Sequence, residues 1–281
     1  MIILDYNGIA ISNIMTGHVN IEEGVVRHQI LNSIRIYRKK HKDKFGEIVI
    51  VADGYKNWRK DVFPQYKAHR KAAQTASPFD WKHVFQLTGQ IYKELQETFP
   101  YVAISMDQCE ADDIIGELVR RTQEFGQGED VLIISSDKDF AQLQKYTNVS
   151  QYSPKLKGMI NDTNPRLNLQ KMILGGDRAD GVPNVLSKDD TFIEGLRQTP
   201  LRQDTIDKLL ADPKSAGDEV YRNYLRNKKL MDLDETPQHL REAINDKYNQ
   251  LSQVVPNRRK VMPYLVAHDC NVLLQTIGDF V

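Results

Sequence analysis

Short apolar runs that alternate with longer amphipathic segments are the feature that most restricts the fold of this chain. Each run is continuous and only four or five residues long, which is typical of strands buried on both faces of a parallel sheet. The runs are Met1–Leu4, Ile48–Ala52, Tyr101–Ser105 and Val131–Ser135. Because the segments between them are long enough to cross back over the sheet, the pattern predicts βαβ units with a crevice at the carboxyl ends of the strands.

Apolar residues at helical spacing predict three helices between these strands and five more after residue 164, where strand-like runs no longer occur. The first three are Ile21–Tyr37, Phe85–Phe99 and Ala111–Phe125. The later five are Pro165–Leu174, Asp204–Ala211, Ala216–Arg226, Gln238–Leu251 and Val261–Ile277. We therefore expect an α/β domain over residues 1–163 and a smaller all-helical domain over residues 164–281.

The composition is that of a globular protein and argues against several other classes. No apolar run approaches the ~18 residues that a membrane helix needs, and the N-terminus lacks the basic start of a secretory signal. A cytoplasmic protein without a membrane partner is expected. Cys109 and Cys270 are too few for a disulfide framework and lack the spacing of a zinc site. The 38 basic and 38 acidic residues cancel, which by itself argues against a nucleic-acid partner.

A total of zero also arises when the two kinds of charge are segregated, and the acids do gather at the predicted strand ends. Asp5 follows the first apolar run, Asp53 the second, and Asp137 and Asp139 the fourth. A single aspartate at such a place is ordinarily a helix cap or a turn residue. Several at one edge of a sheet repel one another, which a divalent cation relieves. Carboxylates without histidine favour Mg²⁺ or Mn²⁺ over zinc.

Two further groups of acids extend this cluster. Glu110, Asp112 and Asp113 open the helix after the third run, where carboxylates meet the positive end of the helix dipole. Asp177 and Asp180 are three residues apart, so that they share a face in a helical turn. These acids are enough to hold two ions, an arrangement that activates water and stabilises the leaving oxygen of a phosphodiester.

A basic and aromatic segment lies between Asp53 and Asp80. It contains six basic residues and one acid, interleaved with five aromatic side chains. This composition is typical of a surface that grips phosphates and stacks on bases, and a solvated basic helix is the ordinary alternative. Lys67 and Arg70 lie at helical spacing and are expected to point together at one phosphate. The residues expected to bind nucleic acid are Lys56, Arg59, Lys60, Tyr66, Lys67, Arg70 and Lys71.

These motifs resemble the 5′-nuclease family of flap endonucleases and 5′-to-3′ exonucleases, and its phage branch most closely. The most specific blocks are Glu110-Ala-Asp-Asp113 and Ser135-Ser-Asp-x-Asp139, in this order along the chain. A lone Asp-x-Asp would mean little. The other matching segments are Leu4–Asn7, Arg27–Ile34, Val51–Asp53, Trp58–Asp61, Tyr66–Arg70, Ile133–Leu143 and Gly176–Val182.

The resemblance implies a PIN-like (resolvase-like) domain, with a mostly parallel sheet and a helical arch at about residues 54–80. Helices that include a helix-turn-helix-like duplex-binding region are expected to follow it. Two Mg²⁺ ions, for which Mn²⁺ can substitute, are implied as cofactors. The ligands of the first match Asp5, Asp53, Asp112 and Asp137, supported by Glu110, and those of the second match Asp139, Asp177 and Asp180. Lys67 and Arg70 match arch residues that contact the scissile phosphate, and with Asp112 and Asp137 they are the expected catalytic residues.

By the same resemblance, the chain is expected to be a monomeric, Mg²⁺-dependent nuclease acting at 5′ ends of RNA–DNA hybrids, duplex DNA and flaps. Phage members of the family remove RNA primers from lagging-strand fragments. Single-strand-binding protein and a sliding clamp are therefore the expected protein partners, and a host cytoplasm the expected location. The chain departs from many members after Asp180, where Gly-Val-Pro-Asn-Val lacks the glycines of a duplex-holding, potassium-binding turn.

Two other functions share part of the pattern. A PIN-type endoribonuclease would have the acid cluster, but it needs neither the Tyr66-Lys-x-x-Arg70 block nor the pair Asp177 and Asp180. A non-catalytic replication protein that binds branched DNA gains nothing from eight carboxylates facing phosphate, because like charges repel. A 5′-nuclease is the favoured interpretation.

Overall fold

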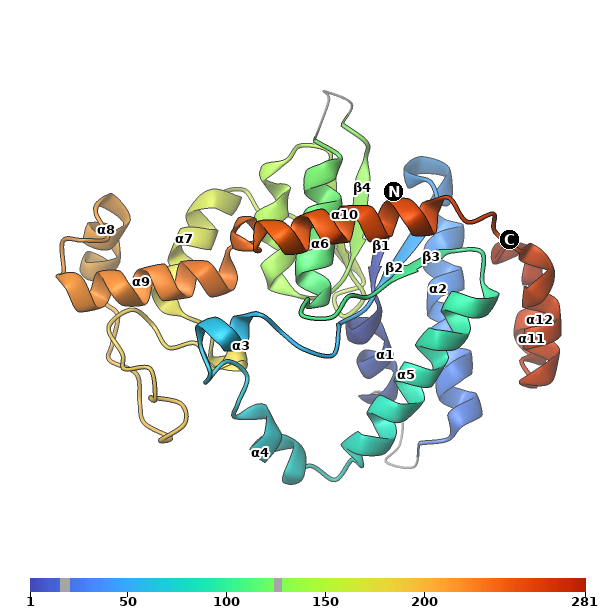
Figure 1. Cartoon of the computed structure of the whole chain (residues 1–281), viewed down its shortest axis with the longest axis horizontal. Helices are drawn as coiled ribbons and strands as arrows, with labels where there is room; N and C mark the ends of the chain where they lie inside the picture. Colours follow the sequence, from blue (N-terminus) through green and yellow to red (C-terminus); the bar gives the residue numbers. More distant parts are fainter. Residues whose placement is uncertain (16–20, 124–127) are drawn as a thin grey trace.

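The computed structural model describes residues 1–15, 21–123 and 128–281, and its centre is a six-stranded sheet (Figure 1). The strand order is β3-β2-β1-β4-β5-β6. The first five strands in this order are parallel, and β6 pairs antiparallel with β5. The strands are β1 (Ile2–Asp5), β2 (Ile48–Val51), β3 (Val102–Ile104), β4 (Val131–Ile134), β5 (Val149–Ser153) and β6 (Gly158–Ile160). The predicted mostly parallel sheet is therefore present.

Both faces of the sheet are covered by helices, which explains why the predicted strands are apolar throughout. Ile2 and Leu4 belong to one apolar layer, whereas Ile3 between them belongs to the other. The first layer contains α1, α2 and α5, and the second contains α6. Their bounds are α1 (Tyr6–Met15), α2 (Glu23–Phe45), α5 (Trp81–Thr98) and α6 (Ala111–Arg121). Successive residues of a strand point to opposite faces, so a doubly covered strand has no polar side.

The four predicted strands end within one residue of their predicted bounds, but α1, β5 and β6 were not predicted. Strand β5 has polar residues at buried positions, because Gln151 and Ser153 are almost fully buried. Gln151 Nε2 donates to the backbone oxygens of Ser135 (3.1 Å) and Asp137 (2.6 Å). Since β5 supports the loop after β4 through this side chain, its sequence lacks the apolar pattern of the other strands.

Two predicted helices end earlier than their patterns indicate. The helix predicted over Ala111–Phe125 ends at Arg121, and residues 124 and 125 lie outside the described residues. The helix predicted over Val261–Ile277 is divided into α11 (Val261–Ala267) and α12 (Asn271–Leu274). Asp269 between them has a φ of +53°, which a right-handed helix cannot contain. None of the described helices combines the length and apolarity needed to cross a membrane.

The segment expected to form the arch is helical only in short parts. After β2 the chain passes through α3 (Arg59–Val62) and α4 (Arg70–Thr75) before it enters α5 (Figure 1). Asp80 caps α5 by accepting a hydrogen bond from His83 N (3.1 Å). Turns and bends connect these short helices. The backbone of this segment therefore stays close to the carboxyl ends of the strands.

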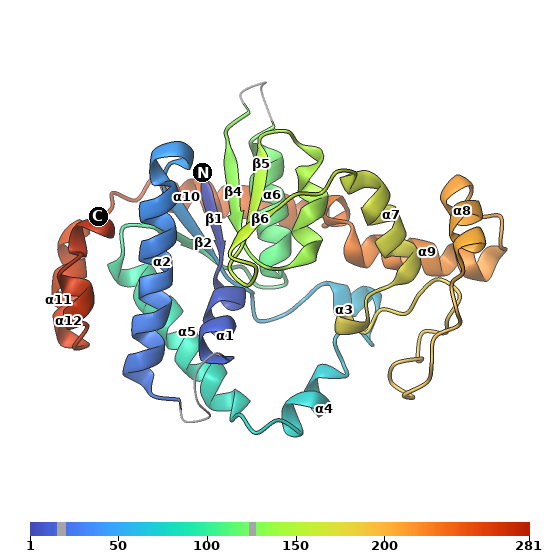
Figure 2. The same ribbon diagram turned by 180° about the vertical axis from the view of Figure 1, so that it is seen from behind.

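The helices after residue 164 form two groups (Figure 2). One group extends to one side of the sheet and has a small apolar core of its own around Leu174 and Leu209. It comprises α7 (Pro165–Gly175), α8 (Gln203–Ala211) and α9 (Asp218–Met231). The other group returns to the sheet: α10 (Gln238–Ser252) joins the layer of α6, and α11 and α12 join the layer of α2. The described elements after residue 164 are thus all helices, as predicted, although they contribute to more than one apolar layer. The predicted domain boundary after residue 163 stays a prediction.

Candidate active site

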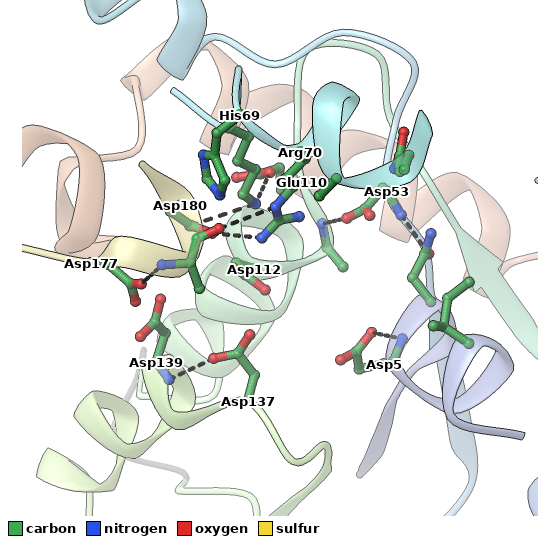
Figure 3. Close-up of a pocket in the computed structure, with 18 of the residues that line it drawn as sticks. Asp5, Asp53, His69, Arg70, Glu110, Asp112, Asp137, Asp139, Asp177 and Asp180 are labelled. Atoms are coloured by element: carbon green, nitrogen blue, oxygen red, sulfur yellow. Dashed lines mark hydrogen bonds and ion pairs between the residues drawn. The ribbon is translucent and has the colours of Figure 1, made fainter. Parts of the chain in front are cut away.

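One cavity of about 610 Å³ brings the predicted metal ligands and arch residues together (Figure 3). All eight predicted carboxylates line it, and so do Lys67 and Arg70. The acids come from the ends of β1, β2 and β4, from the start of α6 and from the turn after α7. They are Asp5, Asp53, Glu110, Asp112, Asp137, Asp139, Asp177 and Asp180. The carboxyl ends of the parallel strands therefore supply a site at the place where such sheets bind ligands.

Asp5 ends β1, and its mostly buried side chain forms part of the wall of the cavity. Its Oδ1 accepts a hydrogen bond from Gly8 N (3.0 Å) and its Oδ2 accepts one from Ser135 Oγ (2.8 Å). Burial raises the pKa of Asp5 to about 6; these hydrogen bonds oppose the rise and the charges of Asp53 and Asp137 add to it. Position 8 has to be glycine for this geometry, because a Cβ there would lie 2.5 Å from Asp5 Oδ2.

Asp53 follows β2 and connects three elements at the edge of the sheet. Its Oδ1 accepts a hydrogen bond from Ala111 N (2.8 Å), at the start of α6. Its own backbone N–H donates to Asn7 Oδ1 (3.0 Å), in α1. Burial raises the pKa of Asp53, although the hydrogen bond from Ala111 opposes this change. The carboxylate is therefore held in place against the start of α6.

The two carboxylates at the start of α6 have opposite environments. Burial alone would raise the pKa of Glu110, but Lys67 and Arg59 outweigh burial and lower it. Burial, followed by the charges of Asp137 and Glu110, holds the pKa of Asp112 well above its usual range. The negative charge of Glu110 is thus already compensated by Lys67 and Arg59, whereas the charge of Asp112 is not compensated.

Asp137 and Asp139 lie at the start of η2 (Lys138–Lys145), the helix that follows β4. Asp137 caps this helix, because its Oδ1 accepts a hydrogen bond from Asp139 N (2.9 Å). Asp139 Oδ1 is buried and has no hydrogen-bond partner among the described residues. Burial, with the charges of Asp137, Asp180 and Asp177, raises the pKa of Asp139 to about 7. An unpaired buried carboxylate oxygen beside like charges is a position that a cation would stabilise.

Asp177 and Asp180 lie at the start and end of η3 (Arg178–Asp180) rather than on one face of an α-helical turn, as their spacing predicted. Asp177 Oδ1 accepts a hydrogen bond from Ala179 N (2.7 Å), and Asp177 pairs with Val182 in an isolated β-bridge. Gly176 precedes this turn at a φ of +67°, and a Cβ there would lie 2.3 Å from Val182 O. The tight turn directs both carboxylates into the cavity (Figure 3).

The arch cations Lys67 and Arg70 are paired with these acids. Lys67 Nζ contacts Glu110 Oε1 and lies 3.6 Å from Asp180 Oδ2, while an Arg70 guanidinium nitrogen lies 2.7 Å from Asp180 Oδ1. Lys67 has a φ of +57° and donates its backbone N–H to Asp180 O (2.8 Å). Burial would lower the pKa of Lys67, but Glu110 and Asp180 outweigh burial and raise it.

Arg59 and Tyr66, which are expected to face nucleic acid, are both only 2% exposed, and their contact with nucleic acid stays a prediction. Arg59 lies 2.8 Å from Asp113 Oδ2 and donates to a backbone oxygen of α9. The hydroxyl of Tyr66 lies 2.9 Å from Glu110 Oε2 and 2.8 Å from Asp180 Oδ2. Their polar atoms are used within the protein, so both residues position the acids. Lys56, Lys60 and Lys71 are exposed, and their predicted contact with nucleic acid stays a prediction.

One residue of the site was missed. Lys138 Nζ lies 2.8 Å from Asp177 Oδ2, and its place between Asp137 and Asp139 could have drawn attention to it. Asp113, whose role the sequence left open, is 1% exposed and accepts hydrogen bonds from Trp58 Nε1 (3.2 Å) and Thr236 Oγ1 (2.9 Å). It is a structural residue that holds the base of the arch against α6.

The residues that line the cavity fit divalent cations in their chemistry. The donors are carboxylate oxygens, which Mg²⁺ and Mn²⁺ prefer, and several have pKa values raised by burial and by one another. Within residues 1–15, 21–123 and 128–281, however, no three His, Cys, Asp or Glu side chains converge closely enough to hold an ion. Lys67, Arg70 and Lys138 neutralise three of the acids instead. Coordination therefore requires these side chains to exchange partners.

Replacing Asp139 by asparagine is expected to stabilise the metal-free protein at pH 8 more than at pH 5. The pKa of Asp139 rises from 3.8 to about 7 on folding, so the folded state holds a proton that the unfolded chain has already lost. Ionisation of this carboxyl thus lowers stability as pH rises from about 4 to about 7, and the gain at pH 8 is on the order of 4 kcal/mol. Thermal unfolding in EDTA at both pH values measures it, with the exposed Asp204→Asn as control. Equal melting temperatures of wild type and Asp139→Asn at pH 8 would contradict the expectation.

Two protein families match the chain, and together they cover most of it. The 5′-3′ exonuclease N-terminal resolvase-like domain matches residues 9–171, and the C-terminal region of T4 RNase H matches residues 163–280. The ribonuclease H of Enterobacteria phage T4 is 33% identical over 99% of this chain and 95% of its own length. The flap endonuclease Xni of Shewanella oneidensis is 31% identical, over 54% of this chain and 55% of its own length.

Solved structures show the same fold. A flap endonuclease of bacteriophage T5, solved as a pseudo-enzyme–product complex with DNA and metal ions, has a TM-score of 0.65 and 17% identity. The likeness covers 90% of this chain and 99% of that one. A T5 5′-exonuclease with bound zinc has the same TM-score, 0.65, at 16% identity. A family match to more than half of the chain, and a relative 33% identical over nearly all of it, show that this chain belongs to the 5′-3′ exonuclease family and is a nuclease.

Proposed function

We propose that the chain is a Mg²⁺-dependent 5′-to-3′ nuclease that hydrolyses phosphodiesters at 5′ ends of RNA–DNA hybrids, duplex DNA and 5′ flaps. The observation that carries the proposal is the convergence of eight carboxylates with Lys67 and Arg70 around one cavity. The names of the relatives, a ribonuclease H and a flap endonuclease, support these substrate classes. Removal of RNA primers in lagging-strand replication is the process in which such substrates arise together.

Divalent ions, when bound, supply a water of lowered pKa and stabilise the charge on the phosphate oxygens. Mg²⁺ is proposed as the natural ion and Mn²⁺ as a substitute, since both accept carboxylate ligands. One ion is assigned to Asp5, Asp53, Glu110, Asp112 and Asp137, and the other to Asp139, Asp177 and Asp180.

Lys67 and Arg70 are proposed to contact the scissile phosphate. In the structure they pair with Glu110 and Asp180, the two acids that face the arch. Once those acids are neutralised in another way, both cations are free to hold the phosphate and to stabilise charge that develops on it. Tyr66, which is hydrogen-bonded to the same two acids, keeps their carboxylates in place below the cations.

A PIN-type endoribonuclease is less well supported. The backbone N–H of Lys67 donates to Asp180 O (2.8 Å), and Arg70 Nε donates to Ala179 O (3.2 Å). The arch and the turn after α7 thus belong to one site, and an endoribonuclease of that type needs neither. A non-catalytic branched-DNA binder does not agree with membership of a nuclease family.

Contacts outside the catalytic cavity complete the proposal. Lys56, Lys60 and Lys71 are proposed to contact nucleic acid around the arch, because they are exposed beside the site. A helix-turn-helix-like region near α7 and α8 is proposed to hold the duplex. Single-strand-binding protein and a sliding clamp as partners, the monomeric state and the cytoplasmic location stay predictions.

Addition of Mg²⁺ to the metal-free protein is expected to raise its melting temperature. An ion that binds only the folded state stabilises it by about 2.7 kcal/mol at a hundred times its dissociation constant, which is about 5 °C for a chain of this size. Differential scanning calorimetry with and without Mg²⁺ measures the shift. Asp139→Asn should reduce the shift and Asp204→Asn should keep it. A wild type that melts at the same temperature in both conditions would contradict a metal site.

Product analysis of end-labelled substrates tests the activity itself. Hybrid, duplex and flap substrates carrying a label at the 5′ or the 3′ end are digested with and without Mg²⁺. Short 5′-labelled products that appear only with Mg²⁺ support the proposal. Internal cuts in single-stranded RNA without dependence on a 5′ end would favour the PIN-type endoribonuclease.

A further inference from the structure

A second cavity, of about 510 Å³, lies on the other side of Lys67 from the catalytic cavity. Asp53, Lys67 and Glu110 line both cavities, so that the two meet at the proposed position of the scissile phosphate. The remaining lining comes from the loop between β2 and α3, from Lys60 and Asp61 of α3, and from Gln108. A polynucleotide held at Lys67 has chain on both sides of the scissile bond, and each side therefore has a cavity next to it.

Tyr55 is the most exposed of the large apolar side chains in the described part of the chain. Its side chain is 95% exposed although it lies two residues after Asp53. Among the described residues its ring stacks on no aromatic side chain and lies under no cation, unlike Tyr66, whose ring lies 4.9 Å from Lys67 Nζ. An aromatic ring without partners beside a catalytic site has its whole face available for a ligand.

The loop that carries Tyr55 is held rigidly. Gly54 N donates to Cys109 O (2.8 Å), Lys56 N donates to Asp107 Oδ1 (3.1 Å), and Trp58 N donates to Gln108 O (3.0 Å). A Cβ at Gly54 would lie 1.8 Å from Met106 O, so only glycine permits this close approach. Because the backbone on both sides of Tyr55 is fixed, the loop itself loses little conformational freedom when a ligand stacks on the ring.

The charges around Tyr55 favour a polyanion. Lys56 and Lys60 are exposed in the same cavity, and Lys67 closes it on the catalytic side. Asp53, Asp61 and Glu110 also line the cavity, but Glu110 is paired with Lys67 and Asp53 belongs to the proposed metal site. Lys56 and Lys60 therefore face Asp61 as the one remaining acid among the described residues of the lining. A flat ring between flexible lysines is the combination that binds single-stranded nucleic acid, through stacking on a base and contact with its phosphates.

We propose that this second cavity binds the unpaired 5′ strand, with a nucleobase stacked on Tyr55 and its phosphates near Lys56 and Lys60. The inference rests on the proposed function and deepens it. An isolated ring stacks readily only on an unpaired base, because the bases of a duplex already stack on one another. In a flap substrate the unpaired nucleotides lie on the 5′ side of the junction. The cavity therefore discriminates substrates that have a flap from those that lack one.

The test compares two substrates with the same duplex, one with an unpaired 5′ flap and one that ends at a nick. Fluorescence anisotropy in Ca²⁺, or with Asp137→Asn in Mg²⁺, measures affinity without cleavage. Tyr55→Ala is expected to weaken flap binding on the order of tenfold, with a much smaller change for the nicked substrate. Tyr55→Phe keeps the ring and should behave as wild type. Val255→Ala, which shortens another highly exposed apolar side chain, near the start of β3, is the surface control.

A second measurement uses 2-aminopurine in the flap, at the unpaired position next to the junction. Stacking on Tyr55 should quench its fluorescence in wild type and Tyr55→Phe, and Tyr55→Ala should restore it. Equal affinity of wild type and Tyr55→Ala for the flap, or an equal loss for both substrates, would overturn the inference. A wild-type protein that cleaves neither substrate in Mg²⁺ would instead overturn the proposed function.

Discussion

Asp137→Asn is expected to lower the rate of cleavage by about a thousandfold or more, whereas nucleic-acid binding is kept or strengthened. Asp137 is a proposed ligand of the first ion, and even residues that only orient a ligand cost about 10- to 100-fold when they are replaced. The same change removes one negative charge that faces phosphate, which favours binding. Catalysis and binding should therefore change in opposite directions.

The substitution is conservative for the fold. Asp137 Oδ1 caps η2 by accepting a hydrogen bond from Asp139 N (2.9 Å), and an asparagine oxygen accepts the same bond. Single-turnover cleavage and anisotropy-based affinity, measured on one flap substrate, separate the two effects. Asp246→Asn removes an exposed carboxylate of α10 and should cleave at the wild-type rate. Full activity of Asp137→Asn would remove the basis of the two-ion proposal.

Lys67→Ala is expected to lower single-turnover cleavage by about 100- to 1,000-fold, the loss seen when one donor to a developing anion is removed. Its effect on stability should be smaller. Lys67 is paired with Glu110 and Asp180, and its loss leaves repulsion between carboxylates that bound Mg²⁺ would relieve. The melting temperature should accordingly fall in EDTA and recover in Mg²⁺, while cleavage stays slow.

Backbone strain does not complicate this comparison. Lys67 has a φ of +57°, and alanine is an L-residue with the same steric cost in that region. Lys157 provides a matched control, since it is an exposed lysine with a φ of +53° in the turn between β5 and β6. Lys157→Ala should leave the cleavage rate unchanged. If Lys67→Ala loses stability in Mg²⁺ in proportion to its loss of activity, then Lys67 is structural.

The sequence predicts the positions of the acids because they depend on chain direction alone. A residue that follows a buried parallel strand must lie at the carboxyl edge of the sheet, so Asp5, Asp53 and Asp137 could be placed without side-chain contacts. The same logic fails for β5, where Gln151 is buried to hold the loop after β4 through hydrogen bonds. A strand whose buried side chains hydrogen-bond to a neighbouring loop lacks the apolar pattern by which strands are predicted.

The arch shows why composition alone could not assign its residues. Arg59 and Tyr66 have the residue types of a nucleic-acid surface, yet both are buried. Their partners, Asp113, Glu110 and Asp180, are distant in sequence, and only the folded chain shows that they are in reach. Buried cations need a paired acid, and the pairing depends on tertiary structure. Asp177 and Asp180 show the same limit. The turn that holds them is determined by Gly176 and Val182, and the spacing of the two aspartates does not predict it.

The return of the last helices to the sheet affects how the protein is made. Residues of α11 and α12 share an apolar layer with β1, and α10 completes the opposite layer over α6. Contacts between such distant segments require closure of very long loops, which slows folding. While the chain emerges from the ribosome, both layers stay partly uncovered until the last helices are synthesised. We therefore expect the acids to converge stably only late in synthesis.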